Sequence, residues 1–179
     1  MAGEYLHTLV VTDVCSGWVE GVALLAREQS LVIEGLRRVQ KLMPVTLRGI
    51  DSDNDSAFIN HSLSKICRHE GIVFTRSRPN RKNHQAWIEQ KNGAVIRKMV
   101  GHERFSGIVA GQALAQLLQT VRLYVNFFQP SFKLRVRLRE GSKIKKTYFS
   151  PATPCDRLLA HDKVSEEVKS FLLIQRDKL

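Results

Sequence analysis

Two acidic residues, Asp53 and Glu89, are separated by thirty-five residues, and a basic segment at residues 76–83 lies shortly before the second of them. Carboxylates bind divalent cations, and such cations neutralise charge on a phosphate under attack. Lys and Arg side chains bind the rest of a DNA backbone. Two acids with a basic segment between them therefore predict a chain that folds around a metal-dependent phosphoryl-transfer site acting on DNA.

Strand and helix patterns alternate along the same stretch, which is typical of an α/β fold. Apolar and β-branched runs predict strands at residues 6–13, 18–24, 45–50 and 72–75. Apolar residues at helical spacing predict helices at 30–42, 58–69, 84–100 and 106–127. This arrangement puts Asp53 just beyond the end of a strand and Glu89 in the early turns of a helix.

Four segments together resemble the catalytic core of retroviral-type integrases and insertion-sequence transposases, over roughly residues 5 to 130. They are residues 9–18, 51–58, 77–83 and 89–92. The resemblance implies a ribonuclease-H-like fold, in which helices flank a mixed sheet. It also implies that Asp53 and Glu89 are catalytic ligands of Mg²⁺ (or Mn²⁺), with two ions in a complete site, that DNA is the partner, and that the protein is a homo-oligomer.

Each acid also has a plainer interpretation. Asp53 lies among Asp, Asn and Ser residues that commonly form turns, and a Glu in a first helical turn is favoured by the helix dipole. The spacing and the flanking motifs favour metal binding over these alternatives. The candidate DNA-binding residues could likewise serve only solubility; they are Arg76, Arg78, Arg81, Lys82 and Lys91. The net charge of +11 favours a polyanionic partner such as nucleic acid.

The chain departs from the resembled family at the first of its three acids. In the family this acid lies on a strand that precedes the segment at residues 6–13, and only four residues precede Tyr5 here. Asp13 is a candidate replacement, although it matches a position on the second strand. We therefore expect a core that lacks its first strand, encoded by a truncated reading frame that starts at an internal Met, and inactive as this fragment. The two strands flanking the gap would then expose unpaired backbone groups.

The composition changes after Pro130, so we expect an integrase-type core at residues 1–130 and a basic C-terminal extension at 131–179. Alternating cations and apolar residues around Gly141 and Ser142 predict a basic β-hairpin or an arm along DNA, with a solvated tail as the alternative. A last helix is expected at about residues 165–175. We find no signal peptide and no apolar run that could span a membrane, which favours a cytoplasmic, nucleoid-associated protein.

Two other functions stay open from the sequence. The chain could be a non-catalytic DNA-binding or interaction module whose acids are vestigial, or a generic nuclease of the same fold. Three scattered cysteines form no C-x-x-C pair, which argues against a zinc site.

Overall fold

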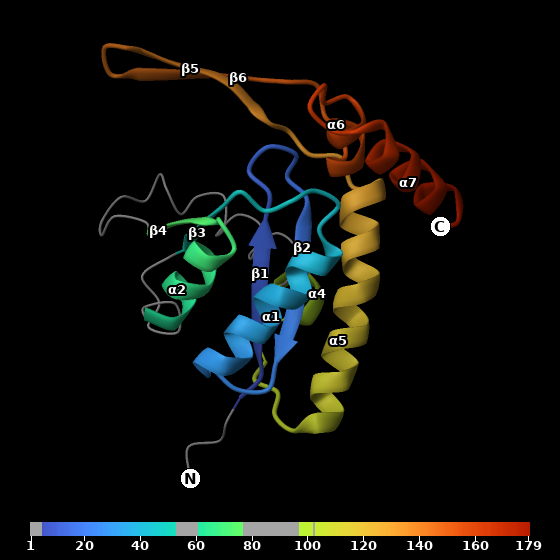
Figure 1. Cartoon of the computed structure of the whole chain (residues 1–179). Coiled ribbons are helices and arrows are strands. Elements are labelled where there is room, and N and C mark those ends of the chain that lie inside the picture. Colours follow the sequence, from blue (N-terminus) through green and yellow to red (C-terminus); the bar gives the residue numbers. More distant parts are fainter. Residues whose placement is uncertain (1–4, 53–60, 77–96, 102) are drawn as a thin grey trace. The chain divides into compact units, whose positions relative to one another are not determined.

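The computed structural model describes residues 5–52, 61–76, 97–101 and 103–179. The chain divides into two compact units, Met1–Arg122 and Leu123–Leu179, and each is described by itself. Figure 1 shows the elements in sequence order from blue to red.

The first unit begins with an antiparallel hairpin of β1 (His7–Thr12) and β2 (Val19–Leu24), close to the bounds expected from the sequence. Helix α1 (Gln29–Leu42) packs against it, as Figure 1 shows. The contact is close because Gly35 has no side chain: a Cβ there would lie 3.0 Å from Leu9 Cδ2. The predicted apolar stripe of α1 is confirmed, since Val32, Leu36 and Val39 are buried.

Helix α5 (Ile108–Leu123) covers the other face of this hairpin. Side chains of successive strand residues point to opposite faces, and a Cβ on Gly21 would lie 3.1 Å from Leu118 Cδ2. Leu114, Leu118 and Val121 are buried, whereas Leu117 is 37% exposed. The hairpin contacts only one stripe of the helix, and Leu117 lies beside that stripe.

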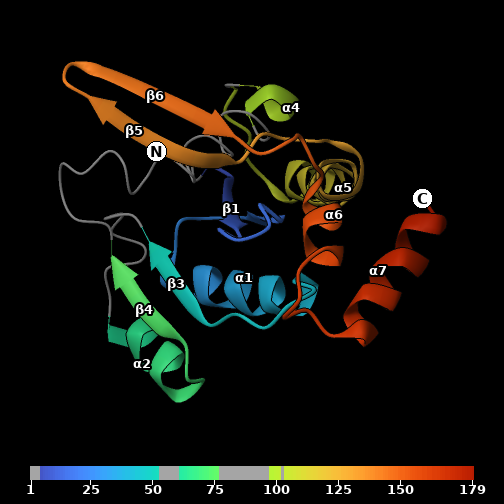
Figure 2. The same ribbon diagram turned by 90° about the horizontal axis from the view of Figure 1, so that it is seen from above.

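A second strand pair consists of β3 (Gly49–Ser52) and β4 (Val73–Arg76), which run parallel, as the two arrows in Figure 2 show. Helix α2 (His61–His69) precedes β4 and ends as the sequence predicts. Gly71 has φ +69°, and the Ile72 and Gly71 amides donate to the carbonyls of Cys67 and Arg68. This is a Schellman cap, in which glycine adopts the left-handed conformation without strain.

The expected strand at residues 45–50 is displaced toward the C-terminus. Pairing with β4 begins only where Gly49 faces Val73, so residues 45–48 are not part of the strand and Asp51 and Ser52 are. The short helix α4 (Lys98–Val100) ends at Gly101, the predicted stop, which has φ +82°. The rest of the helix expected at residues 84–100 lies largely outside the described residues.

The described strands form three two-stranded sheets rather than one mixed sheet. Within the described part of the chain, β1 pairs only with β2, and β3 pairs only with β4. The mixed sheet expected of a ribonuclease-H-like fold is thus seen in these residues as separate strand pairs.

The second unit begins with a π-helical turn, η2 (Tyr124–Phe128), and continues through the hairpin of β5 (Leu134–Glu140) and β6 (Lys143–Tyr148). Helices α6 (Pro154–Leu159) and α7 (Glu166–Asp177) follow. The predicted hairpin turn at Gly141–Ser142 and the last helix are confirmed, whereas α6 was not expected. The core of the unit consists of Val125, Phe127, Cys155, Leu158 and Leu172.

Candidate functional site

The carboxyl ends of β3 and β4 lie side by side. In this parallel pair Ser52 faces Arg76, and each is the last residue of its strand. Asp53 follows Ser52 in the sequence, and the basic segment begins at Arg76. Ligand sites of open α/β sheets commonly lie beyond the carboxyl ends of parallel strands. The segment that contains Asp53 and the basic segment that begins at Arg76 therefore leave the strand pair at neighbouring positions.

Asp51 is an acid of this edge that the sequence motif does not use. Its Oδ1 accepts a hydrogen bond of 2.9 Å from Thr75 Oγ1, on the facing residue of β4. This bond joins the two strands near their carboxyl ends. Asp51 is thus a structural acid two positions from Asp53, and it provides a matched control for that residue.

Ser52 is 5% exposed, and its Oγ has no hydrogen-bond partner among the described residues. Thr12 Oγ1, at the end of β1, is likewise buried and unpartnered there. A buried hydroxyl without a partner loses its bonds to water and gains none in return. Two strand ends of the first unit therefore each carry a buried hydroxyl that has no partner among the described residues.

Arg76 is the one predicted DNA-binding residue that the structure describes. Its side chain is exposed, and its guanidinium carbon lies 5.8 Å from the centre of the Phe74 ring, two residues earlier on the same strand face. The ring supports the cation from one side. The other predicted site residues lie outside the described residues; they are Asp53, Arg78, Arg81, Lys82, Glu89 and Lys91.

Asp13, the candidate replacement for the first acid, belongs to the turn between β1 and β2. Its Oδ2 accepts hydrogen bonds from the backbone amide of Ser16, at 2.7 Å, and from Ser16 Oγ, at 2.5 Å. An aspartate that bonds to the backbone ahead of it is a common turn former. This geometry gives Asp13 a structural role. Within the described ranges, no cluster of three or more His, Cys, Asp or Glu side chains could hold a metal ion.

An ion pair that the sequence analysis did not anticipate joins β2 to α5. Glu20 is fully buried and accepts 2.5 and 2.7 Å hydrogen bonds from Arg122 Nε and Nη2. Trp18 Nε1 also donates to Glu20, at 2.7 Å. The sequence does contain a sign of this pair. Glu20 shares one strand face with the apolar residues Trp18, Val22 and Leu24, and a buried acid on such a face needs a partner.

The integrase core domain family matches residues 1–82. The fold is similar to the catalytic core domain of BIV integrase, with a TM-score of 0.55 and 18% sequence identity, over 83% of this chain and 82% of that one. The resemblance to integrase cores is confirmed. The integrase-type core accordingly has the ribonuclease-H-like fold that the resemblance implied.

The chain is also similar to two longer proteins. The protein y4rM of Sinorhizobium fredii, described as uncharacterized, is 48% identical over 156 residues, which are 87% of this chain and 45% of the relative. The chain thus spans about half the length of that curated relative. A simian T-cell lymphotropic virus intasome in complex with a PP2A regulatory subunit matches with a TM-score of 0.52 and 18% identity, over 69% of this chain and 43% of that one. In the part of this chain that the structure describes, no helix has the length and apolar character needed to cross a membrane.

Proposed function

We propose that this integrase-type core binds DNA and holds Mg²⁺ or Mn²⁺ through Asp53 and Glu89, as part of the phosphoryl-transfer machinery of DNA integration or transposition. The observation that carries the proposal is the pairing of Ser52 with Arg76. Because of this pairing, the segment with Asp53 and the basic segment after Arg76 begin at adjacent strand ends. The match of residues 1–82 to the integrase core domain family supports the same assignment.

The proposed donors suit the proposed ion. Both are carboxylates, and hard oxygen ligands are what Mg²⁺ and Mn²⁺ prefer. Such an ion, when bound, neutralises charge on the phosphate under attack. The chain's own contribution is to hold the DNA backbone, which we assign to Arg76, Arg78, Arg81, Lys82 and Lys91. Arg76 is exposed and therefore accessible to a phosphate, and its guanidinium carbon lies 5.8 Å from the centre of the Phe74 ring.

We further propose that this 179-residue chain does not join DNA strands unaided. The motif supplies two of the three acids, and the Asp13 carboxylate is engaged by Ser16. The purified chain is expected to show neither strand transfer nor metal-dependent nicking. Robust Mg²⁺-dependent cleavage that Asp53→Asn abolishes would refute this part of the proposal. Self-association into a homo-oligomer belongs to the same proposal and is measured by light scattering with and without DNA.

The alternative is that the chain is a non-catalytic DNA-binding module. The observation in its favour is the basic hairpin of β5 and β6 in the second unit. The two proposals differ in how DNA binding responds to metal. We would measure the affinity for a labelled DNA duplex in Mg²⁺ and in EDTA at equal ionic strength, for wild type, Asp53→Asn, Glu89→Gln and the control Asp51→Asn.

A Mg²⁺/EDTA affinity ratio that falls in Asp53→Asn and Glu89→Gln but not in Asp51→Asn supports the metal-binding core. A ratio that is the same in all four proteins, with binding that still weakens as salt increases, supports the module without metal.

A further inference from the structure

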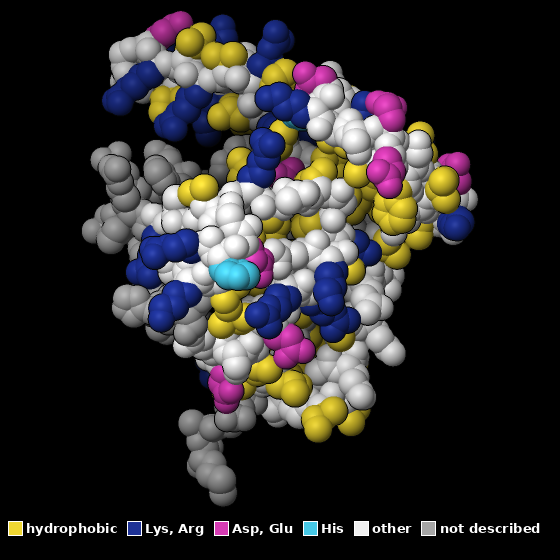
Figure 3. Space-filling model, viewed as in Figure 1, with side chains coloured by type: hydrophobic (Ala, Val, Ile, Leu, Met, Phe, Trp, Pro, Cys, Tyr) yellow, Lys and Arg dark blue, Asp and Glu magenta, His cyan; other side chains and the backbone are white. Residues whose placement is uncertain are grey.

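The hairpin of β5 and β6 concentrates the positive charge of the chain. Residues 133–149 hold seven Lys or Arg residues and one acid, a net charge of +6 in less than a tenth of the chain, which carries +11 in all. Every residue of both strands is exposed except Leu134, which is half-buried. Dark blue side chains project from this hairpin in Figure 3, with yellow apolar side chains between them. A polyanion is the partner that such a charge density attracts.

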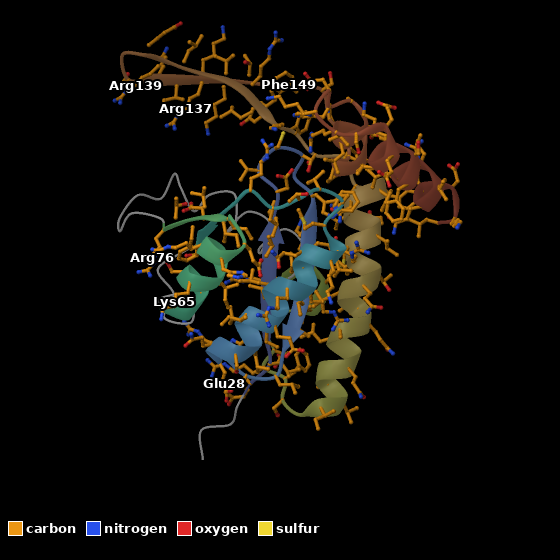
Figure 4. All side chains as sticks on the ribbon, in the orientation of Figure 1. Glu28, Lys65, Arg76, Arg137, Arg139 and Phe149 are labelled. Atoms are coloured by element: carbon orange, nitrogen blue, oxygen red, sulfur yellow. The ribbon has the colours of Figure 1, made fainter. Side chains whose placement is uncertain are left out.

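The strand register sorts the charges onto two unequal faces. Arg137 faces Lys146 and Arg139 faces Ile144, so three cations share one face without an acid between 136 and 147. Figure 4 shows Arg137 and Arg139 pointing to the same side of the ribbon. The opposite face is mixed, because it carries Lys143 and Lys145 together with one acid and two apolar residues; these are Glu140, Val136 and Leu138.

The base of the hairpin is held by hydrogen bonds, whereas its two strands are exposed. Ser131 and Ala152 exchange backbone hydrogen bonds of 3.0 and 3.3 Å, and the Arg157 guanidinium donates to the Ser131 carbonyl. Burial lowers the pKa of Arg157 from its ordinary value, which fits an arginine used for structure. At the tip, Gly141 has φ +60°, which permits the tight two-residue turn.

An isolated two-stranded hairpin is marginally stable in water. This one keeps several large side chains in the open, among them Leu138 at 51% and Ile144 at 47% exposure. It does contain local support near its base, because the Arg135 guanidinium stacks 5.6 Å from the Phe149 ring centre. The hairpin thus has an anchored base, exposed strands and one cationic face. These are the features of an element that is stabilised by binding a partner.

We propose that the β5–β6 hairpin is a second DNA-binding site, which lays the face of Arg137, Arg139 and Lys146 against the phosphates of duplex DNA. The major groove of B-form DNA admits a two-stranded β-ribbon, whereas the deep, narrow major groove of A-form RNA does not. The inference rests on the proposed function for its choice of DNA among polyanions. It extends that function to a unit outside the residues matched by the integrase core domain family.

The test compares two charge-matched variants of the full chain. Arg137→Ala/Arg139→Ala removes two cations from the proposed binding face, and Lys143→Ala/Lys145→Ala removes two from the other face of the same hairpin. Duplex DNA binding is measured by fluorescence anisotropy in EDTA, across about 50 to 200 mM salt. EDTA removes any contribution of the metal site, so failure here leaves the proposed function untouched and failure of the metal site leaves this test valid.

The arginine pair is expected to lose at least about tenfold in affinity, and its slope of log affinity against log salt should fall by about 2, because each phosphate contact contributes about 0.9. The lysine pair should lose clearly less. Arg137→Lys/Arg139→Lys keeps the charge and should keep most of the affinity. Far-UV circular dichroism and the urea midpoint establish that each variant is folded.

Three results would overturn the proposal. Equal loss in the two alanine pairs would mean that net charge, and no particular face, drives binding. Unchanged binding in the arginine pair would mean that the hairpin does not contact DNA. Equal or tighter binding of an RNA duplex of the same sequence, or of vesicles rich in anionic lipid, would assign the hairpin to that partner instead.

Discussion

Glu20 on β2 and Arg122 on α5 form a buried bidentate ion pair, with Arg122 Nε 2.5 Å from Glu20 Oε2 and Nη2 2.7 Å from Oε1. Arg122 Nη2 also donates to the Leu42 carbonyl at the end of α1, at 3.3 Å. The pair thus joins three elements of the first unit at one point. Glu20 lies on the β1–β2 hairpin, within the residues 1–82 that match the integrase core domain family.

Removal of the arginine should be costly. Arg122→Ala leaves the Glu20 carboxylate buried without its counter-charge, and breaking a buried pair in this way costs about 3–5 kcal/mol of unfolding free energy. Urea unfolding monitored by Trp fluorescence measures the loss, and Trp18 is a direct reporter because its Nε1 donates to Glu20. The control is Lys169→Ala, which breaks an exposed pair with Glu166 and should cost at most about 1 kcal/mol. Equal losses in the two variants would contradict a special role for the buried pair.

The two unsatisfied hydroxyls give a prediction of opposite sign. Thr12→Val and Ser52→Ala remove buried oxygens that have no partner in the described residues, so each should leave stability unchanged or raise it by up to about 1–2 kcal/mol. The contrast is Thr153→Val, because Thr153 Oγ1 accepts from the Asp156 amide at 3.0 Å in the capping box of α6. Losing that cap should cost about 1 kcal/mol. Clear destabilisation by Thr12→Val would show that its hydroxyl has a partner after all.

The thiols give a prediction about alkaline pH. Burial raises the pKa of Cys67 and of Cys155 above the ordinary value of 9.0. The unfolded chain therefore loses these protons at a lower pH than the folded chain does. The contribution to stability is fully present below pH 9.0 and is lost as the pH rises from there through the folded pKa values. Urea midpoints measured across this range should fall for wild type and fall less for Cys67→Ser/Cys155→Ser.

The same burial predicts the pattern of alkylation. Cys15 is exposed, whereas Cys67 and Cys155 are buried. Iodoacetamide added to the folded chain at neutral pH should modify Cys15 first, and all three thiols only after denaturation. Mass spectrometry of the labelled peptides reads this directly. Rapid labelling of Cys155 in the folded chain would contradict the packing of the second unit.

Local patterns predicted much of this fold, because the relevant interactions are short in sequence. The stripe of Val32, Leu36 and Val39 defines α1, Gly71 ends α2, and Gly141–Ser142 turns the basic hairpin. Each of these features depends on residues a few positions apart. Four short segments together indicated the resemblance to integrase cores, and the family match over residues 1–82 confirms that resemblance.

The features that the sequence did not reveal depend on distant partners. Glu20 and Arg122 are 102 positions apart, and the local sequence around either residue does not indicate the other as its partner. The start of β3 is set by where β4 lies opposite it, so the apolar run at residues 45–50 placed the strand too early. Helix α6 is only six residues long, too short for an apolar period, although its Thr-Pro-x-Asp start is a helix-capping signature that we did not use.

We propose above that Asp53 and Glu89 together bind one divalent cation. Mn²⁺ titration followed by electron paramagnetic resonance tests this most directly. The account predicts that wild type binds Mn²⁺, that Asp53→Asn and Glu89→Gln each weaken binding by at least about tenfold, and that the double variant is little worse than either single one. Asp51→Asn, whose carboxylate bonds to Thr75, should bind as wild type does. Wild-type affinity for Mn²⁺ in either Asp53→Asn or Glu89→Gln would contradict the account.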